Sequence, residues 1–273
     1  MNHFIQAYLA RKAHVLFGLL MSIFMIAPLL AVVPISFSSG TFLSYPLPGL
    51  SLQWYERVFT SGPWMQALSN SLWVGIASTL LATLLGTLAA LAFARRNLPA
   101  ASGMLGLLIS PMIFPPVISG LGMYFLFGKL GLTGTLSGLI LAHTVLATPF
   151  VLISVAASLQ GFDMTLLKAA AMSGASPVRA FTGIALPIIA PGVISGALFA
   201  FMTSFDEIVV VLFIGGPSQR TLPRQMFDGI RDTIDPSILA MSTLLLLVGI
   251  VGLMTTTWLT LRAQRTARQL KEQ

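Results

Sequence analysis

Cysteine is absent from this 273-residue chain, and charged residues are scarce. Without a thiol, the chain forms no disulfide and no thiolate metal site. Only 8% of the residues are charged, against about 25% in an average soluble domain, whereas 56% are hydrophobic. Most of the chain must therefore face lipid or other apolar protein.

Several signatures of catalysis are missing as well. The chain has no glycine-rich phosphate-binding loop that ends in lysine and serine or threonine; Gly128-Lys129-Leu130 fails that pattern at its third position. If ATP drives this protein, another chain must bind the nucleotide. No HExxH or paired-histidine spacing occurs, so we expect no metal site, no cofactor and no catalytic residue.

Long apolar runs are present instead, and six of them are about 20 residues long, enough to cross a membrane as helices. No run has the alternating pattern of a barrel strand, so we expect an all-α polytopic membrane protein. Pro111, Pro115 and Pro116 predict a kinked or broken third helix. Gly192 and Gly196 fit either a close helix crossing or background glycine frequency. The six predicted spans are residues 15–36, 71–93, 104–127, 132–154, 184–204 and 238–261 of one transmembrane domain, 1–273.

Lysine and arginine are unevenly distributed around these spans. With both termini inside, ten of them lie on the inner side and five on the outer side. This asymmetry predicts cytoplasmic termini and outward-facing loops at about 37–70 and 205–236. The net charge of +7 therefore reflects membrane orientation rather than nucleic-acid binding. The first run follows basic residues, as in a signal peptide, but it is too long for one, and we expect a retained span.

A polar-ended segment, 163–187, separates the fourth and fifth runs. Asp163 is suited to cap a short helix, and Gly174 to end that helix in a left-handed turn. Ser176 followed by Pro177 is a second helix start. The intervening alanines, 169–171, would let another protein approach closely. From geometry alone, an ordinary helix lying on the membrane surface fits this segment equally well.

The segment resembles the cytoplasmic EAA loop of permease subunits from binding-protein-dependent ABC importers. The residues in register with that loop are Ala169, Ala170, Gly174, Ala175, Ile184, Leu186 and Pro187. The resemblance implies a type I importer permease fold and makes 163–183 a coupling loop, which docks into a groove of a separate ATPase subunit. Lys168 stands where the family usually has glutamate, so the charge of that contact is reversed.

Acidic residues concentrate on the predicted outer side. Asp206 and Glu207 follow Phe205 at the end of the fifth run. Ionisable side chains at membrane depth are costly and usually line a polar path, so these three residues are our candidates for the substrate pathway. The alternative is that the acids lie in the outer headgroup zone.

A second resemblance covers the C-terminal part of the chain, where the pattern matches polyamine-type permeases, the spermidine and putrescine importers. The residues that carry it are Ser204-Phe205-Asp206-Glu207, Phe213, Gly216-Pro217, Thr221-Leu222-Pro223, Met226-Phe227, Ile230-Arg231 and Asp235-Pro236. The resemblance implies a polyamine as the cargo, although the same subfamily serves other small solutes.

We therefore expect a non-catalytic permease subunit of an ABC importer in a bacterial inner membrane. The implied partners are two ATPase subunits, a second and different permease subunit, and an external solute-binding protein. The alternatives are a permease for another small solute, a secondary transporter and an intramembrane enzyme. One broken span without a convincing repeat disfavours a secondary transporter. His143 lacks an accompanying nucleophile signature, and its role is either an interhelical hydrogen bond or a substrate contact.

Overall fold

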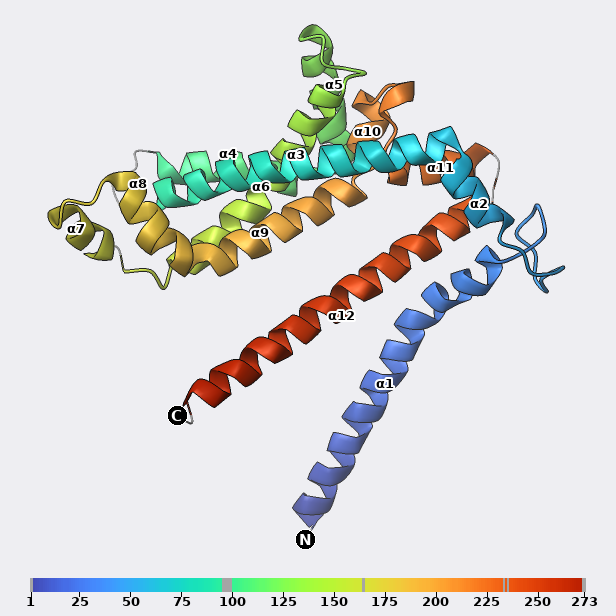
Figure 1. Ribbon diagram of the computed structural model, residues 1–273, viewed down its shortest axis with the longest axis horizontal. Coiled ribbons are helices and arrows are strands. Elements are labelled where there is room, and N and C mark those ends of the chain that lie inside the picture. The colour runs from blue at the N-terminus through green and yellow to red at the C-terminus, as the bar shows by residue number, and fades with distance from the viewer. Residues whose placement is uncertain (1, 95–99, 164, 233, 235, 272–273) are drawn as a thin grey trace. The chain divides into compact units, whose positions relative to one another are not determined.

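The computed structural model describes residues 2–94, 100–163, 165–232, 234 and 236–271. Apart from an isolated antiparallel bridge between Ser38 and Leu50, these residues contain helices, turns and irregular segments, so the expected all-α class is confirmed. In chain order (Figure 1), the elements are α1 (Asn2–Ser36), α2 (Gln53–Thr60), α3 (Gly62–Phe93), α4 (Ala101–Ile113), α5 (Pro116–Lys129), α6 (Leu136–Leu159), α7 (Thr165–Met172), α8 (Pro177–Ala180), the π-helical turn η1 (Phe181–Ala185), α9 (Leu186–Asp206), α10 (Val209–Ile214), the 3₁₀ turn η2 (Pro217–Gln219), α11 (Leu222–Asp232) and α12 (Ser237–Lys271).

The chain divides into two compact units. The larger unit contains residues 62–227, and with them every candidate site residue named above. The smaller unit combines residues 1–61 with residues 228–273.

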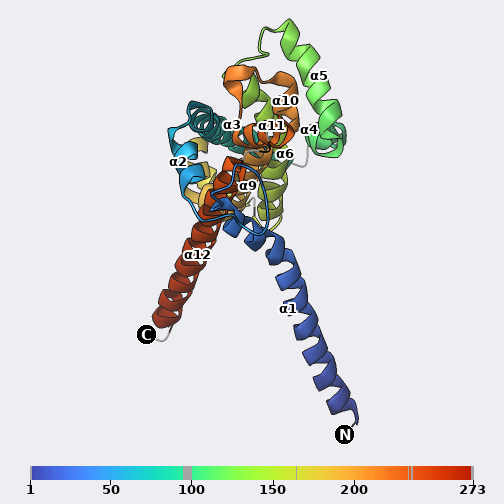
Figure 2. The same cartoon turned by 90° about the vertical axis from the view of Figure 1, so that its right-hand side faces the viewer.

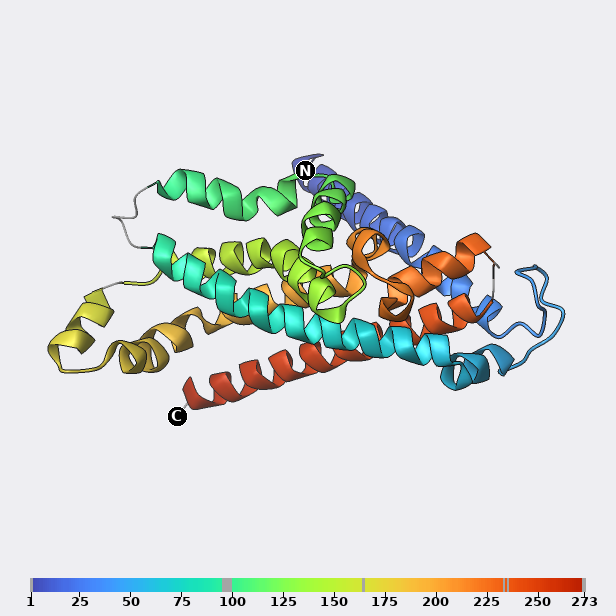
Figure 3. The same ribbon diagram turned by 90° about the horizontal axis from the view of Figure 1, so that it is seen from above.

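Three long helices, α3, α6 and α9, form the centre of the larger unit and lie side by side (Figures 1 and 3). Glycines allow this close approach. A Cβ atom on Gly86 of α3 would lie 2.7 Å from the Cβ atom of Val151 on α6, and one on Gly196 of α9 would lie 2.9 Å from the Cα atom of Val151. Gly192 faces Ser158 of α6 in the same way. The Gly192/Gly196 pair is therefore a close helix crossing, as small residues permit in membranes.

The third predicted span is broken, as its prolines predict. Helix α4 ends before Phe114, and α5 leaves it at an angle of 108°. Figure 2 views α4 nearly end-on, with α5 turned away from it. Pro111 inside α4 has no N–H to donate to the carbonyl of Leu107. The hydroxyl of Ser110 donates to that carbonyl instead, over 2.8 Å. A local side chain thus satisfies the freed backbone group, which is how proline is tolerated in spanning helices.

The count of six spans is not confirmed. Four helical stretches of the described chain are long and apolar enough to cross a membrane, and the bent α4–α5 pair raises the number to five. The sixth predicted span lies within α12, whose described apolar segment, Ser237–Gly252, is shorter than a span. The four stretches are Lys12–Ser36, Gly62–Phe93, Leu136–Leu159 and Pro177–Asp206.

Two span boundaries differ from the prediction for local reasons. Helix α3 begins at Gly62 rather than at 71, with Pro63 in its first turn, where the missing proline N–H costs nothing. Helix α6 begins at Leu136 rather than at 132, because the Thr135 side chain caps it by accepting the N–H of Gly138 over 3.0 Å. The predicted outer loops also contain helices: α2 and the start of α3 lie in 37–70, and α10, η2 and α11 lie in 205–236.

In the smaller unit, side-chain contacts fasten the end of α1 to α2. The indole Nε1 of Trp54 donates to the carbonyl of Ser38 over 2.9 Å. The hydroxyls of Ser36 and Tyr55 lie 2.6 Å apart. Helix α12 contacts both α1 and α2.

Candidate functional sites

The turn between α7 and α8 has a defined geometry. Gly174 has a φ of +82°, in the left-handed region that its sequence position predicts. Its N–H donates to the carbonyl of Ala171, and the N–H of Ala175 donates to the carbonyl of Ala170, each over 3.0 Å. These two bonds are the pair that closes a Schellman turn, and they satisfy the last carbonyls of α7.

Side chains also cap the start of α7 and the start of α8. A carboxylate oxygen of Asp163 accepts the N–H of Thr165 over 2.9 Å. Hydrogen bonds from the side chain and the backbone of Thr165 lower the pKa of the exposed Asp163 carboxyl, and the charge of Lys168 acts in the same direction. The hydroxyl of Ser176 accepts the N–H of Arg179 over 3.3 Å at the start of α8. We call residues 163–180 the α7–α8 element.

The α7–α8 element is well exposed. None of the residues of α7 is buried, and Lys168 and Ala169 are exposed. Its most exposed large apolar side chains, Met172 and Val178, are 83% and 72% exposed. Its C-terminal end continues through the π-helical turn η1 into α9. The element therefore presents a fixed, partly apolar surface at one end of the larger unit.

The three candidate pathway residues lie at the other end of α9, and they differ in their surroundings. The ring of Phe205 stacks on Phe201, with centroids 5.5 Å apart. Asp206, the last residue of α9, is exposed. Glu207 is half-buried, and its Oε1 atom accepts the N–H of Val210 over 2.8 Å. The two neighbouring acids therefore differ: Glu207 accepts a hydrogen bond at the start of α10, whereas Asp206 is exposed.

Helix α10 is held by opposite charges at its two ends. Glu207 accepts a hydrogen bond at its N-terminus, as described. At the C-terminus, Nη1 of Arg224 donates to the carbonyls of Val211 and Gly215 over 2.8 and 2.7 Å. An anion at the start and a cation at the end both oppose the partial charges of a helix. The sequence offers no local signal for the Arg224 contact.

A buried polar network links the three central helices. The Nδ1 atom of His143 on α6 and the hydroxyl of Ser204 on α9 lie 2.8 Å apart. Ser78 on α3 donates to the same Ser204 hydroxyl over 3.0 Å. All three side chains are buried, so His143 makes the interhelical hydrogen bond that was one of its two expected roles. No local pattern in the sequence identifies Ser204 as its partner, because the two residues are 61 positions apart.

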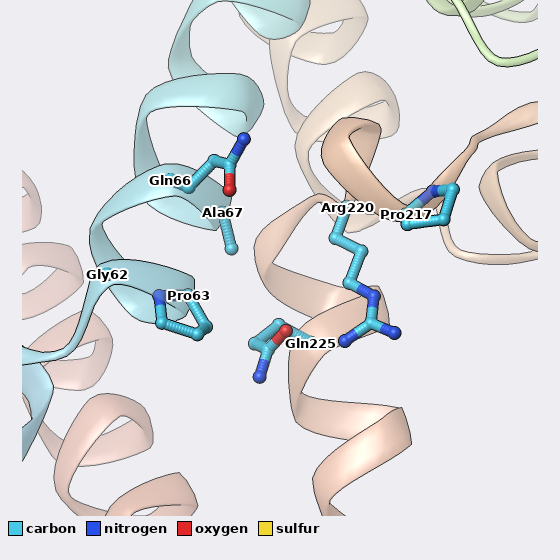
Figure 4. A pocket seen from close by; sticks show the side chains of 7 residues that line it. All are labelled: Gly62, Pro63, Gln66, Ala67, Pro217, Arg220 and Gln225. Carbon is cyan, nitrogen blue, oxygen red and sulfur yellow. The ribbon is translucent and has the colours of Figure 1, made fainter.

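A pocket of about 310 Å³ lies where the start of α3 meets η2 and α11 (Figure 4). In Figure 4, the side chain of Arg220 reaches toward Gln225, and Gln66 extends from α3. The residues that line it are Gly62, Pro63, Gln66, Ala67, Pro217, Arg220 and Gln225. We call this the Arg220 pocket; no local pattern in the sequence predicts it.

The Arg220 pocket and the α7–α8 element lie at opposite ends of the larger unit (Figures 1 and 3). The turn between α5 and α6 lies at the pocket end, because the N–H of Gly134 donates to the carbonyl of Ile214 over 2.8 Å. Within the described residues, no group of three or more histidine, aspartate or glutamate side chains is placed to hold a metal ion.

Comparison with known proteins gives consistent matches. Residues 82–268 match the family described as the binding-protein-dependent transport system inner membrane component. The chain is 34% identical over 238 residues to the putrescine transport system permease protein PotI of Escherichia coli strain K12, covering 84% of each chain. It is 31% identical over 224 residues to the spermidine/putrescine transport system permease protein PotC of Haemophilus influenzae, covering 82% of this chain and 86% of that one.

Solved structures share the fold. A chain from a bacterial ABC transporter involved in the import of alginate, an acidic polysaccharide, matches with a TM-score of 0.71 at 14% identity, covering 90% of this chain and 96% of that one. A chain of the inward-facing methionine transporter MetNI matches with a TM-score of 0.52 at 21% identity, covering 72% and 95%. These matches support the expected type I permease fold.

Proposed function

Since the chain belongs to the family of inner membrane components of binding-protein-dependent transport systems, we propose that it is the permease subunit of an ATP-driven importer of polyamines. Members of this family are non-catalytic, multi-pass membrane proteins. The polyamine cargo is inferred from the 31–34% identity, over 82–84% of the chain, to permeases named for putrescine and spermidine.

The proposed transporter combines this chain with two ATPase subunits, a second and different permease, and an external binding protein. This chain has no phosphate-binding loop, so a separate subunit hydrolyses ATP. The α7–α8 element is the proposed ATPase contact, with Lys168, Ala169, Ala170, Gly174 and Ala175 at its centre. Its Schellman turn and its two caps give it a fixed shape, and a rigid element transmits a displacement without bending.

The proposed topology puts the α7–α8 element and both termini in the cytoplasm of a bacterial cell. The excess of lysine and arginine on that side supports this orientation. Because the Arg220 pocket and the C-terminal end of α9, which Asp206 forms, lie at the opposite end of the larger unit, both then face the outer side.

The proposed cargo path passes Phe205, Asp206 and Glu207. Each ammonium group of a polyamine loses hydration on entering a narrow path, and a carboxylate offsets that loss by a charge-assisted hydrogen bond. The exposed Asp206 is available for this contact, whereas Glu207 already accepts the N–H of Val210. The stacked rings of Phe201 and Phe205 offer an aromatic face to a cation.

The test is uptake into proteoliposomes that contain the complete transporter and enclose ATP. Radiolabelled putrescine and spermidine are compared with one anionic and one neutral solute. We expect polyamine uptake that requires both ATP and the binding protein. Uptake driven by an ion gradient without ATP would instead identify a secondary transporter. Stimulation of ATP hydrolysis by the anionic or the neutral solute alone would reject the polyamine as cargo and leave the permease assignment intact.

A further inference from the structure

The last turns of α9 are held from two sides by the neighbouring helices. Ser204 is buried, and its hydroxyl lies 3.0 Å from that of Ser78 on α3 and 2.8 Å from the Nδ1 atom of His143 on α6. About one turn earlier, a Cβ atom on Gly75 of α3 would lie 3.0 Å from the ring atom Cε2 of Phe201. That ring therefore packs directly on the backbone of α3, and both neighbours meet the end of α9.

The direction of these hydrogen bonds follows from the number of protons. A serine hydroxyl has one proton to donate. Ser78 lies 3.0 Å from Ser204 and 3.2 Å from the carbonyl of Gly75, and we assign its proton to the shorter contact. The proton of Ser204 is then free to be donated to Nδ1 of His143, and in a neutral imidazole Nε2 carries the ring proton. The donors thus run from α3 through α9 to α6.

Apolar packing alone does not require a histidine at this position. The Nε2 atom of His143 is buried and has no hydrogen-bond partner among the described residues. A buried polar atom without a partner is costly, and a leucine would avoid that cost. The imidazole differs from leucine in being directional, because a hydrogen bond depends on its angle, whereas an apolar contact does not. The contact with Ser204 is therefore able to fix the rotation of a helix.

The rotation of this last turn sets the direction of Asp206. Successive residues of an α-helix are about 100° apart around the axis, so Asp206 lies about 200° from Ser204. Ser204 is accordingly buried, whereas Asp206 is exposed. A rotation that carried Ser204 away from His143 would turn Asp206 through the same angle.

We propose that His143 is a positioning residue for Asp206. By accepting the proton of Ser204, it keeps the last turn of α9 in the rotation that directs the Asp206 carboxylate into the cargo path. A charge-assisted hydrogen bond to an ammonium group depends on that alignment. His143 itself stays buried and does not touch the cargo. This inference rests on the proposed function, because it requires Asp206 to line the path of a cationic cargo.

The experiment is a double-mutant cycle on the complete transporter in proteoliposomes, with the binding protein at saturation. The maximal rate of radiolabelled putrescine uptake is measured for His143→Leu, Asp206→Asn and the double variant. His143→Leu is expected to lower the rate about fivefold, the equivalent of one hydrogen bond between neutral groups. Asp206→Asn lowers it about tenfold. The double variant is expected to be no slower than Asp206→Asn, because His143 acts through Asp206.

Two further variants separate positioning from a folding defect. His143→Asn places an amide on Cγ, the atom to which Nδ1 of the imidazole is bonded. It is expected to restore most of the uptake that leucine loses, because the amide oxygen accepts the proton of Ser204. Thr144→Val is the matched control. It removes a buried hydroxyl next to His143 that donates to the carbonyl of Ile140 in its own helix, and it should leave uptake unchanged.

The outcomes distinguish this inference from the proposed function. A double variant about fiftyfold slower than wild type, the product of the two single effects, overturns the positioning role, because independent sites multiply. Wild-type uptake in either single variant overturns it as well, and so does an equal loss in His143→Leu and His143→Asn. Each of these results leaves the importer assignment in place. If the wild-type transporter shows no ATP-dependent uptake of putrescine, the proposed function fails, and the positioning role fails with it.

Discussion

The Nδ1 atom of His143 and the hydroxyl of Ser204 lie 2.8 Å apart in the core of the larger unit, and this contact joins α6 to α9. Because Ser78 of α3 donates to the same hydroxyl, a single serine connects three helices. The other ring nitrogen of His143, Nε2, is buried and has no hydrogen-bond partner in the part of the chain that the structure describes. The network is therefore centred on Ser204 and incompletely satisfied at its histidine end.

This arrangement predicts an order of stabilities. Ser204→Ala removes the partner of both neighbours and leaves His143 buried without its bond, which is expected to cost about 1–3 kcal/mol of unfolding free energy. Ser78→Ala is expected to cost less, because the Ser204–His143 bond remains. Thermal unfolding of the purified subunit, followed by tryptophan fluorescence, gives the order.

The matched control is the double variant Ser204→Ala/His143→Leu, which replaces the orphaned imidazole by an apolar side chain. It is expected to be more stable than Ser204→Ala alone, because removing both partners is less costly than stranding one. If the two single serine variants are equally stable, Ser204 is not the centre of the network.

Substitution of Gly174 tests the proposed ATPase contact. Gly174→Val forces a β-branched residue to a φ of +82°, at a cost of roughly 1 kcal/mol or more, and distorts the Schellman turn. The subunit is expected to reach the membrane but to lose ATPase association and uptake. Co-purification of the ATPase and radiolabelled uptake measure the two effects.

Two variants control the Gly174 experiment. Gly174→Asn is expected to retain most activity, because asparagine tolerates the left-handed region. Gly161→Val places the same side chain in open space after α6, at a residue without a positive φ. Normal uptake in Gly174→Val would remove the coupling role from the α7–α8 element.

The acids at the end of α9 are expected to respond differently to substitution. Asp206→Asn removes a charge from the proposed path and should lower polyamine uptake about tenfold, while the complex still assembles. Glu207→Ala removes the acceptor for Val210 and should cost about 1 kcal/mol of stability, whereas Glu207→Gln keeps a carbonyl oxygen for that bond. Uptake and thermal unfolding are measured on the same preparations.

The exposed acid Asp232 provides the control for these two. Asp232→Asn changes the net charge equally but lies outside the proposed path, so uptake should stay at the wild-type level. If Asp206→Asn imports putrescine as fast as this control, Asp206 is a bystander in the headgroup zone.

The topology can be tested with single cysteines, because the native chain has none. Ala175→Cys is expected to resist a membrane-impermeant thiol reagent applied to intact spheroplasts, and Ser218→Cys, at the opposite end of the larger unit, is expected to react. Opening the cells should make the first position reactive. Labelling of Ala175→Cys from outside intact cells contradicts the orientation.

Local signals in the sequence were sufficient for local structure. Asp163, Gly174 and Ser176 each act on backbone groups within five positions, and each does what its residue type predicts. The break beside Pro115 follows from the same kind of rule. The cap at Thr135 is equally local, and it starts α6 four residues after the predicted position.

Contacts between segments far apart in the chain could not be predicted from such local signals. Asn70 holds carbonyls about 150 positions away, and Arg224 reaches back to α10, although neither residue stands in a distinctive pattern. The place of Glu207 at the end of an apolar run predicts a pathway residue, whereas the structure shows that its carboxylate accepts the N–H of Val210, three positions on. The Arg220 pocket depends on such long-range contacts, and for that reason it emerged only from the structure.

Because side chains bind both ends of α10, the stability of this helix depends on where those side chains lie. A helix of six residues is too short to persist by itself, so its order depends on its packing and on the contacts at its ends. One of those contacts comes from Glu207, which directly follows the last turn of α9. Any displacement that withdraws this carboxylate shifts α10 toward its unfolded form, and its amide protons then exchange faster with solvent. The position of α9 thereby changes the folding equilibrium of α10.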